Sequence, residues 1–110
     1  MSSERPTEKE LLKSVLEPLL EDFQYWFDRS RSLLESERLT FFSAEEQARL
    51  LNKIARSQKE VSTAQILFKA TNGEAGIDSN MLLPWHQLVV ECWDLARKRR
   101  ELKGDRLLDS

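Results

Sequence analysis

The first third of the chain keeps a strict alternation of four and three residues between the side chains of one stripe. The positions in that stripe are Leu12, Leu16, Leu19, Phe23, Trp26, Ser30 and Leu33. This is the a/d rhythm of helices that pack lengthwise against one another, whereas a β-strand, with its period of two, would scatter these side chains over both faces. The same rhythm returns in two later segments. The sequence therefore predicts an all-α fold made of long helices.

The composition agrees with long helices and with a single domain. The 110 residues include only three Gly and three Pro, and 40% are hydrophobic while 33% are charged. A turn-rich β-sandwich needs more Gly and Pro, and a disordered chain has fewer apolar residues. The length suits one hydrophobic core and excludes a multidomain enzyme.

The first helix is expected over residues 8–37. Thr7 and Glu10 have the spacing of a capping box, in which each side chain satisfies a backbone N–H at the start of a helix. Pro18 falls inside the apolar pattern, where it removes a backbone hydrogen bond. Because the apolar phase continues across it, we expect a kink near residues 14–18 rather than a break into two helices.

The second helix is expected over residues 44–70, after a second capping box formed by Ser43 and Glu46. Its a/d positions are Gln47, Leu51, Ile54, Gln58, Val61, Gln65 and Phe68. Three glutamines make this seam more polar than an ordinary core. Gln58 and Gln65 are therefore expected to hydrogen-bond to each other, to Ser30 or Ser62, or to water, or else to face a partner that completes the bundle.

The third helix is expected over residues 80–103, after a loop rich in turn residues. Gly73 is placed to adopt the left-handed conformation that ends the second helix, and Asp78 or Ser79 can cap the third. Gly104 is expected to stop it. Its a/d positions are Met81, Trp85, Leu88, Cys92 and Leu95.

Three helices of similar length, joined by one short and one moderate connection, predict an elongated antiparallel three-helix bundle with coiled-coil-like seams. The bundle would occupy residues 8–104, with residues 1–7 disordered and residues 105–110 frayed. The alternative is a two-helix hairpin whose third helix completes the bundle of a partner or of a second copy.

Three strings of the sequence are distinctive: LEPLLEDF at residues 16–23, EVSTAQ at 60–65 and LPWHQLV at 83–89. Together they resemble a family of small, uncharacterised cyanobacterial proteins that carries a domain of unknown function. The resemblance extends over roughly residues 10–100. It implies a helical protein of the cyanobacterial cytosol, and it assigns no catalytic or binding residue.

No catalytic or metal-binding pattern emerges from the reactive residues. His86 is the only histidine, and its neighbours at three residues, Leu83 and Val89, cannot be the carboxylate that a metal site in a helical bundle needs. Cys92 is the only cysteine and falls on an apolar seam, about 120° around the helix from His86, so the two cannot form a nucleophile–base pair within that helix. We expect no metal, no cofactor and no enzymatic activity.

The surface most suited to a partner is a flank of the third helix. It consists of His86, Val90, Trp93, Arg97 and Arg100. Trp and Arg are enriched in protein interfaces, because they bring contact area and directed hydrogen bonds at modest entropic cost. The alternative interpretation is that Val90 and Trp93 only broaden the core contact with the first or second helix.

The basic run at residues 97–100 raises an alternative function, the regulatory binding of an anionic ligand, a nucleic acid or a lipid head group. Four consecutive basic residues spread around a whole helix, and 17 basic against 19 acidic residues give a net charge of −2, so nucleic acid or a membrane is an unfavoured partner. We expect a cytoplasmic interaction module, acting as an adaptor, assembly or regulatory factor. Its partner would be another protein, or a second copy of this chain in a homo-oligomer.

Overall fold

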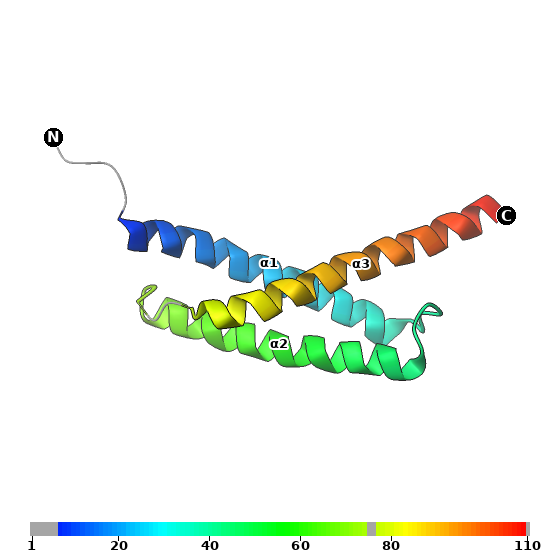
Figure 1. The fold of residues 1–110 in the computed structure, drawn as a ribbon, viewed down its shortest axis with the longest axis horizontal. Coiled ribbons are helices and arrows are strands. Elements are labelled where there is room, and N and C mark those ends of the chain that lie inside the picture. The colour runs from blue at the N-terminus through cyan, green and yellow to red at the C-terminus, as the bar shows by residue number, and fades with distance from the viewer. Residues whose placement is uncertain (1–6, 75–76, 110) are drawn as a thin grey trace.

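The computed structural model describes residues 7–74 and 77–109, and this part of the chain is helical with no strand. Its elements are α1 (Glu8–Ser36), α2 (Ala44–Ala70) and α3 (Ser79–Asp109). The molecule is elongated, with extents of 67 × 28 × 19 Å. Consecutive helices run in opposite directions, and α3 crosses the α1–α2 hairpin obliquely (Figure 1). The predicted all-α helical bundle is confirmed.

Local sequence signals explain where α1 and α2 begin. The Thr7 hydroxyl accepts a hydrogen bond from the Glu10 backbone N–H, and the full capping box is present at Ser43 and Glu46. Each bond satisfies an N–H that has no partner within the helix. Helix α1 continues through Pro18 without a break. The disorder expected for residues 1–7 lies outside the described residues, apart from Thr7, which is the cap.

A left-handed turn ends α2, at the position expected from the sequence. Asn72 and Gly73 have φ angles of 53° and 83°, and the Gly73 N–H donates to the Phe68 carbonyl at 2.7 Å. A Cβ atom at Gly73 would lie 2.8 Å from the Cδ atom of Lys13. Both the backbone angle and the nearby lysine therefore favour glycine here.

Helix α3 is longer than the sequence predicted, because Gly104 does not end it. The backbone stays helical to Asp109, so the expected helix end at residue 103 is wrong, whereas the fraying expected for residues 105–110 stays a prediction. A glycine inside a helix costs only about 1 kcal/mol relative to alanine, which good helix formers around it can offset. The last turns of α3 extend beyond the end of the α1–α2 hairpin (Figure 1).

The core lies between α1 and its two neighbours. Its largest fully buried side chains are Trp85, Phe23, Phe27, Leu20, Ile54, Leu88, Leu95, Val61 and Cys92. On α1 the most buried positions include Leu20, Phe27 and Leu34, whereas Leu12 of the predicted seam is 59% exposed. The spacing was thus recognised correctly, but the centre of the seam lies to one side of the predicted line, because α1 must serve two neighbours in different directions.

One buried glutamine closes the connection between α1 and α2. The Gln47 amide donates to the carbonyls of Leu34 and Glu37 at 3.0 and 2.6 Å. Its oxygen accepts from the Leu39 N–H and from the Arg38 guanidinium, each at 3.0 Å. Gln47 is therefore a structural residue of the turn and not a polar member of a helix seam.

Candidate protein-binding groove

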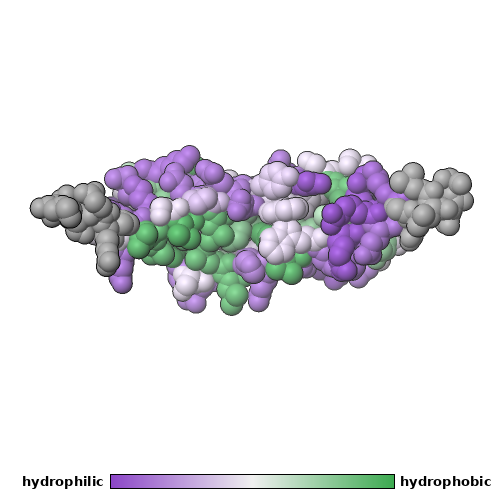
Figure 2. Space-filling model, turned by 90° about the horizontal axis from the view of Figure 1, so that it is seen from above, coloured by the Kyte–Doolittle hydropathy of each residue, from purple (hydrophilic) through white to green (hydrophobic). Residues whose placement is uncertain are grey.

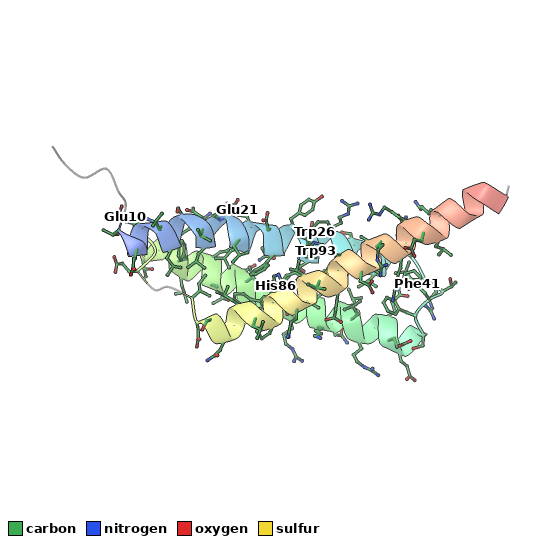
Figure 3. The ribbon with its side chains drawn as sticks, turned by 45° about the horizontal axis from the view of Figure 1, so that its top comes forward. Glu10, Glu21, Trp26, Phe41, His86 and Trp93 are labelled. Carbon is green, nitrogen blue, oxygen red and sulfur yellow. The ribbon has the colours of Figure 1, made fainter. Side chains whose placement is uncertain are left out.

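The predicted flank of α3 lies at the surface. His86, Val90, Trp93, Arg97 and Arg100 are all exposed, and Val90 and Trp93 keep 45% and 43% of their area in contact with solvent. Little more than half of the area of Val90 and of Trp93 is buried, so the interpretation that both residues simply broaden the core explains only that buried part. The flank is close to α1 along one edge, where Trp93 meets Trp26 (Figure 3).

Three aromatic rings follow one another across the boundary between α1 and α3. The ring centroids of Trp26 and Trp93 are 6.1 Å apart with nearly perpendicular planes, and those of Trp93 and His86 are 6.2 Å apart with the same geometry. Edge-to-face contacts of this kind are favourable beyond the area that they bury. They fix the exposed Trp93 in place although much of it faces water.

A groove of about 530 Å³ opens beside this aromatic contact. Its walls are Trp26, Arg29, Leu33, Ser36 and Glu37 of α1 and Trp93, Ala96, Arg99 and Arg100 of α3. Only Trp93 and Arg100 belong to the flank predicted from the sequence. The sequence analysis places Trp26 and Leu33 in the a/d stripe of the first helix and so does not predict the α1 wall. Helix α3 crosses α1 obliquely (Figure 1), and a groove is open beside these two side chains.

The apolar surface continues from this groove toward the start of α1. Leu12 and Val15 are 59% and 58% exposed, and Leu19 is half-buried between them and Trp26. Positions 12, 15, 19 and 26 lie on one side of a helix. Figure 2 shows hydrophobic surface over this half of the molecule, next to more polar surface at its other end. We call the set Leu12, Val15, Leu19, Trp26, Leu33, Val90 and Trp93 the apolar face.

Most of the basic run on α3 is paired within the chain. Arg97 contacts Asp94 and Glu101, Lys98 contacts Asp94 at 3.2 Å, and Arg99 forms a two-pronged hydrogen bond to the Glu37 carboxylate. Hydrogen bonds from Arg97 and Lys98 lower the pKa of Asp94, and the hydrogen bond to Glu37 raises the pKa of Arg99. Three of the four positive charges at residues 97–100 thus have a carboxylate beside them.

The predicted polar seam lies elsewhere, on the α1–α2 side. The Gln24 amide donates to the Gln58 carbonyl at 3.1 Å, to the Ser62 hydroxyl at 2.8 Å and to the Gln65 side chain at 3.3 Å. Arg31 donates to the side chain of Gln58 at 2.9 Å. Ser62 was one of the expected hydrogen-bonding groups, but the network is centred on Gln24 and Arg31 of α1, which lie outside the stripe predicted for that helix.

A second groove of about 820 Å³ runs along this network and is lined mainly by polar side chains. Its residues are Gln24, Tyr25, Asp28, Arg31, Gln58, Lys59, Ser62 and Thr63. No described buried side-chain nitrogen or oxygen lacks a hydrogen-bond partner. In the polar seam, the side-chain oxygens of Gln58 and Gln65 accept hydrogen bonds from Arg31 and Gln24 of the same chain.

The single cysteine and the single histidine of the chain lie in different surroundings. Cys92 is fully buried, its thiol is in hydrogen-bond contact with Ser30, and burial raises its pKa to about 11. His86 is exposed and its ring contacts Trp93 rather than Cys92. Among the described residues no three His, Cys, Asp or Glu side chains gather as a metal site would require. In the same part of the chain no helix has the length and apolar content needed to span a bilayer.

Comparison with known families places almost the whole chain in one of them. The chain belongs to the family described as protein of unknown function DUF2605, which matches residues 6–101. The resemblance to an uncharacterised family is thereby confirmed. No curated protein and no solved structure matches the chain.

Proposed function

We propose that this member of the DUF2605 family is a small non-catalytic module that binds another protein, by accepting an amphipathic helix of that protein along the apolar face. The observation that carries the proposal is the contact of Trp26 and Trp93 across the edge of an open groove. Two large aromatic side chains are held in fixed positions there while one of them stays 43% exposed. Such side chains are typical centres of binding energy in protein interfaces.

The dimensions of the apolar face support a helix as the occupant. From Leu12 to Leu33 the face follows 21 residues of α1, which is about 31 Å at 1.5 Å per residue. The half-buried Leu19, Trp26 and Leu33 already pack on the core, so the floor of the groove continues the interior of the bundle. A fourth helix laid there would pack against α1 and α3 in the way that helices of a bundle pack on one another.

The charges around the groove support a partner whose polar side is acidic. Arg29, Arg99 and Arg100 line the groove, while Glu37 is its single acidic lining residue. Complementary charge speeds encounter and sets the partner's register. A helix with an apolar stripe flanked by carboxylates therefore fits better than a basic one.

The alternative function, binding of nucleic acid or lipid head groups by the basic end of α3, has less support. Arg97, Lys98 and Arg99 already contact carboxylates of this chain. A site for a polyanion needs several free cations in a row. The cytoplasmic location and cyanobacterial origin expected from the sequence are part of the proposal, and fractionation of native cells would test the location.

The proposal is tested with a synthetic helical peptide that carries a leucine stripe and glutamates beside it. Binding is followed by fluorescence anisotropy of a dye on the peptide, for the wild type, for Val90→Asp and for Ile66→Asp. Both substitutions place a carboxylate on a helix surface, but Ile66 is 67% exposed on α2 and lies outside the apolar face. Val90→Asp is expected to weaken binding about tenfold or more, and Ile66→Asp by less than about twofold.

Circular dichroism of the same proteins separates loss of binding from loss of structure, since both variants should keep the helical signal. The proposal is wrong if the wild type does not bind the peptide, or if the two variants bind it equally well. Sedimentation equilibrium gives the third outcome: a wild-type dimer that Val90→Asp alone dissociates would mean that a second copy occupies the face.

A further inference from the structure

We infer that Arg29 of α1 and Arg100 of α3 together bind a carboxylate of the partner helix in the groove, which lies at the Trp26–Leu33 end of the apolar face. The inference rests on the proposed function, because it specifies the chemistry of the helix that the groove accepts. The two arginines come from different helices and line the groove that Trp26 and Trp93 also line. A carboxylate placed between them would be held from both walls.

Arg29 is oriented without being neutralised. Its guanidinium carbon lies 5.8 Å from the centre of the Trp26 ring, and its Nη1 donates to the Tyr25 hydroxyl at 3.0 Å. Tyr25 in turn packs edge-on against Trp26 at 5.2 Å. These contacts hold the guanidinium over the groove floor. A hydroxyl and a ring face leave its positive charge and most of its five N–H donors available to an anion.

Arg100 differs from the other basic residues near it. In the described part of the chain no carboxylate forms an ion pair with Arg29 or Arg100, whereas Arg97, Lys98 and Arg99 each have one. Arg99 lines the same groove, but its two-pronged bond to Glu37 already uses the geometry that a carboxylate would need. The free charge of the groove is therefore concentrated on Arg29 and Arg100.

The arrangement also gives the partner helix a direction. Basic side chains of both helices line the groove. Toward Leu12 and Val15, among the side chains that the structure describes, the apolar face has no comparable cation, because Lys13 is turned to the Asn72 side chain of the α2–α3 connection. A carboxylate at one end of the partner's apolar stripe would thus be favoured at the Trp26 end. An apolar stripe without charges at either end could bind in either direction.

The test uses three helical peptides with the same leucine stripe. One carries two glutamates near its N-terminus, one carries them near its C-terminus, and one has glutamine at all of those positions. Anisotropy titrations compare the wild type with Arg29→Gln, Arg100→Gln and the control Arg56→Gln, which removes an exposed arginine of α2 outside the groove.

One of the two glutamate peptides is expected to bind the wild type about fivefold more tightly than the glutamine peptide at low salt, and the other with little advantage. Arg29→Gln and Arg100→Gln should each remove most of that advantage while leaving the affinity for the glutamine peptide unchanged, and Arg56→Gln should keep it. A preference that survives both groove substitutions, or equal binding of all three peptides, would overturn the inference and leave the proposed function standing. Failure of every peptide to bind would refute the proposed function as well.

Discussion

The two grooves beside α1 are built from opposite kinds of side chain. On the α1–α2 side, Gln24 and Arg31 donate hydrogen bonds to residues of the α2 seam, so these groups already have partners within the chain. On the α1–α3 side, Trp26 and Trp93 meet edge to face and leave apolar area in contact with water. A satisfied hydrogen bond has little left to offer a partner, whereas exposed apolar area still has its free energy of burial to gain.

The two grooves should also contribute differently to folding stability and to partner binding. The polar network lies at a surface, where water can replace a lost hydrogen bond, and so it adds little stability. The aromatic contact is half-buried on one wall, at Trp26, and exposed on the other, at Trp93, so the two tryptophans should contribute very differently to folding while contributing alike to binding. The following experiments test this comparison.

Gln47→Leu should have the largest effect, because the Gln47 side chain is buried and all of its polar atoms are hydrogen-bonded. The substitution removes the acceptor of the buried Leu39 N–H and one hydrogen bond to each of the carbonyls of Leu34 and Glu37. Urea unfolding should show a loss of about 3 kcal/mol. A loss below about 1 kcal/mol would mean that water satisfies these groups and that the turn is more open than it is in the structure.

The interior beneath the apolar face should exclude water, and the titration of the buried Cys92 thiol tests this. Burial raises the pKa of the folded thiol to about 11, above the value near 9 of an exposed thiol. The native state therefore holds the proton more tightly than the unfolded state. The resulting stabilisation is complete below about pH 9 and is lost as the pH rises toward about 11.

The measurement is the free energy of unfolding of the wild type minus that of Cys92→Ala across this pH window. The difference should fall by about 2 kcal/mol, since one pKa unit corresponds to about 1.4 kcal/mol. A difference that does not depend on pH would show that water reaches the α1–α3 interior.

Replacing each tryptophan of the groove by alanine should have different effects on stability and similar effects on binding. Trp26→Ala should cost about 2 kcal/mol of unfolding free energy, because Trp26 is partly buried on the core, and Trp93→Ala less than about 1 kcal/mol. Both variants should lose most of their affinity for the leucine-stripe peptide, as measured by anisotropy. Retained binding by Trp93→Ala would place the partner elsewhere on the molecule.

Gln58→Leu combined with Gln65→Leu should have the smallest effect. Both side chains are half-buried, and Gln24 and Arg31 can turn to water when their acceptors are removed. The free energy of unfolding, followed by thermal denaturation, should change by less than about 1 kcal/mol, and sedimentation should give the same oligomeric state as for the wild type. A change of oligomeric state on this double substitution would identify the α1–α2 groove, rather than the apolar face, as an interface.

The candidate site was half visible in the sequence. Val90 and Trp93 could be assigned to a flank, because their angular position on one helix follows from their numbers alone. Trp26, Leu33 and Arg29 could not, because whether a stripe on α1 is covered depends on the direction in which α3 crosses it. The pairing of Arg97 and Arg99 with carboxylates, and the lack of such a partner for Arg100 among the described residues, likewise depend on which side chains the crossing brings together.

The sequence by itself determined the local structure of this protein: three helices, the N-terminal caps of α1 and α2, and the left-handed turn at Gly73. These features depend on hydrogen bonds and backbone angles within a few residues, so a short string of letters contains the information that they need. The tertiary structure alone decided that α1 lies between two neighbours, that α3 crosses obliquely, and that one side of α1 closes with polar bonds while the other stays open and apolar. Those outcomes depend on how side chains of distant segments pack against each other, and spacing along one helix does not specify the angle at which the next helix crosses it.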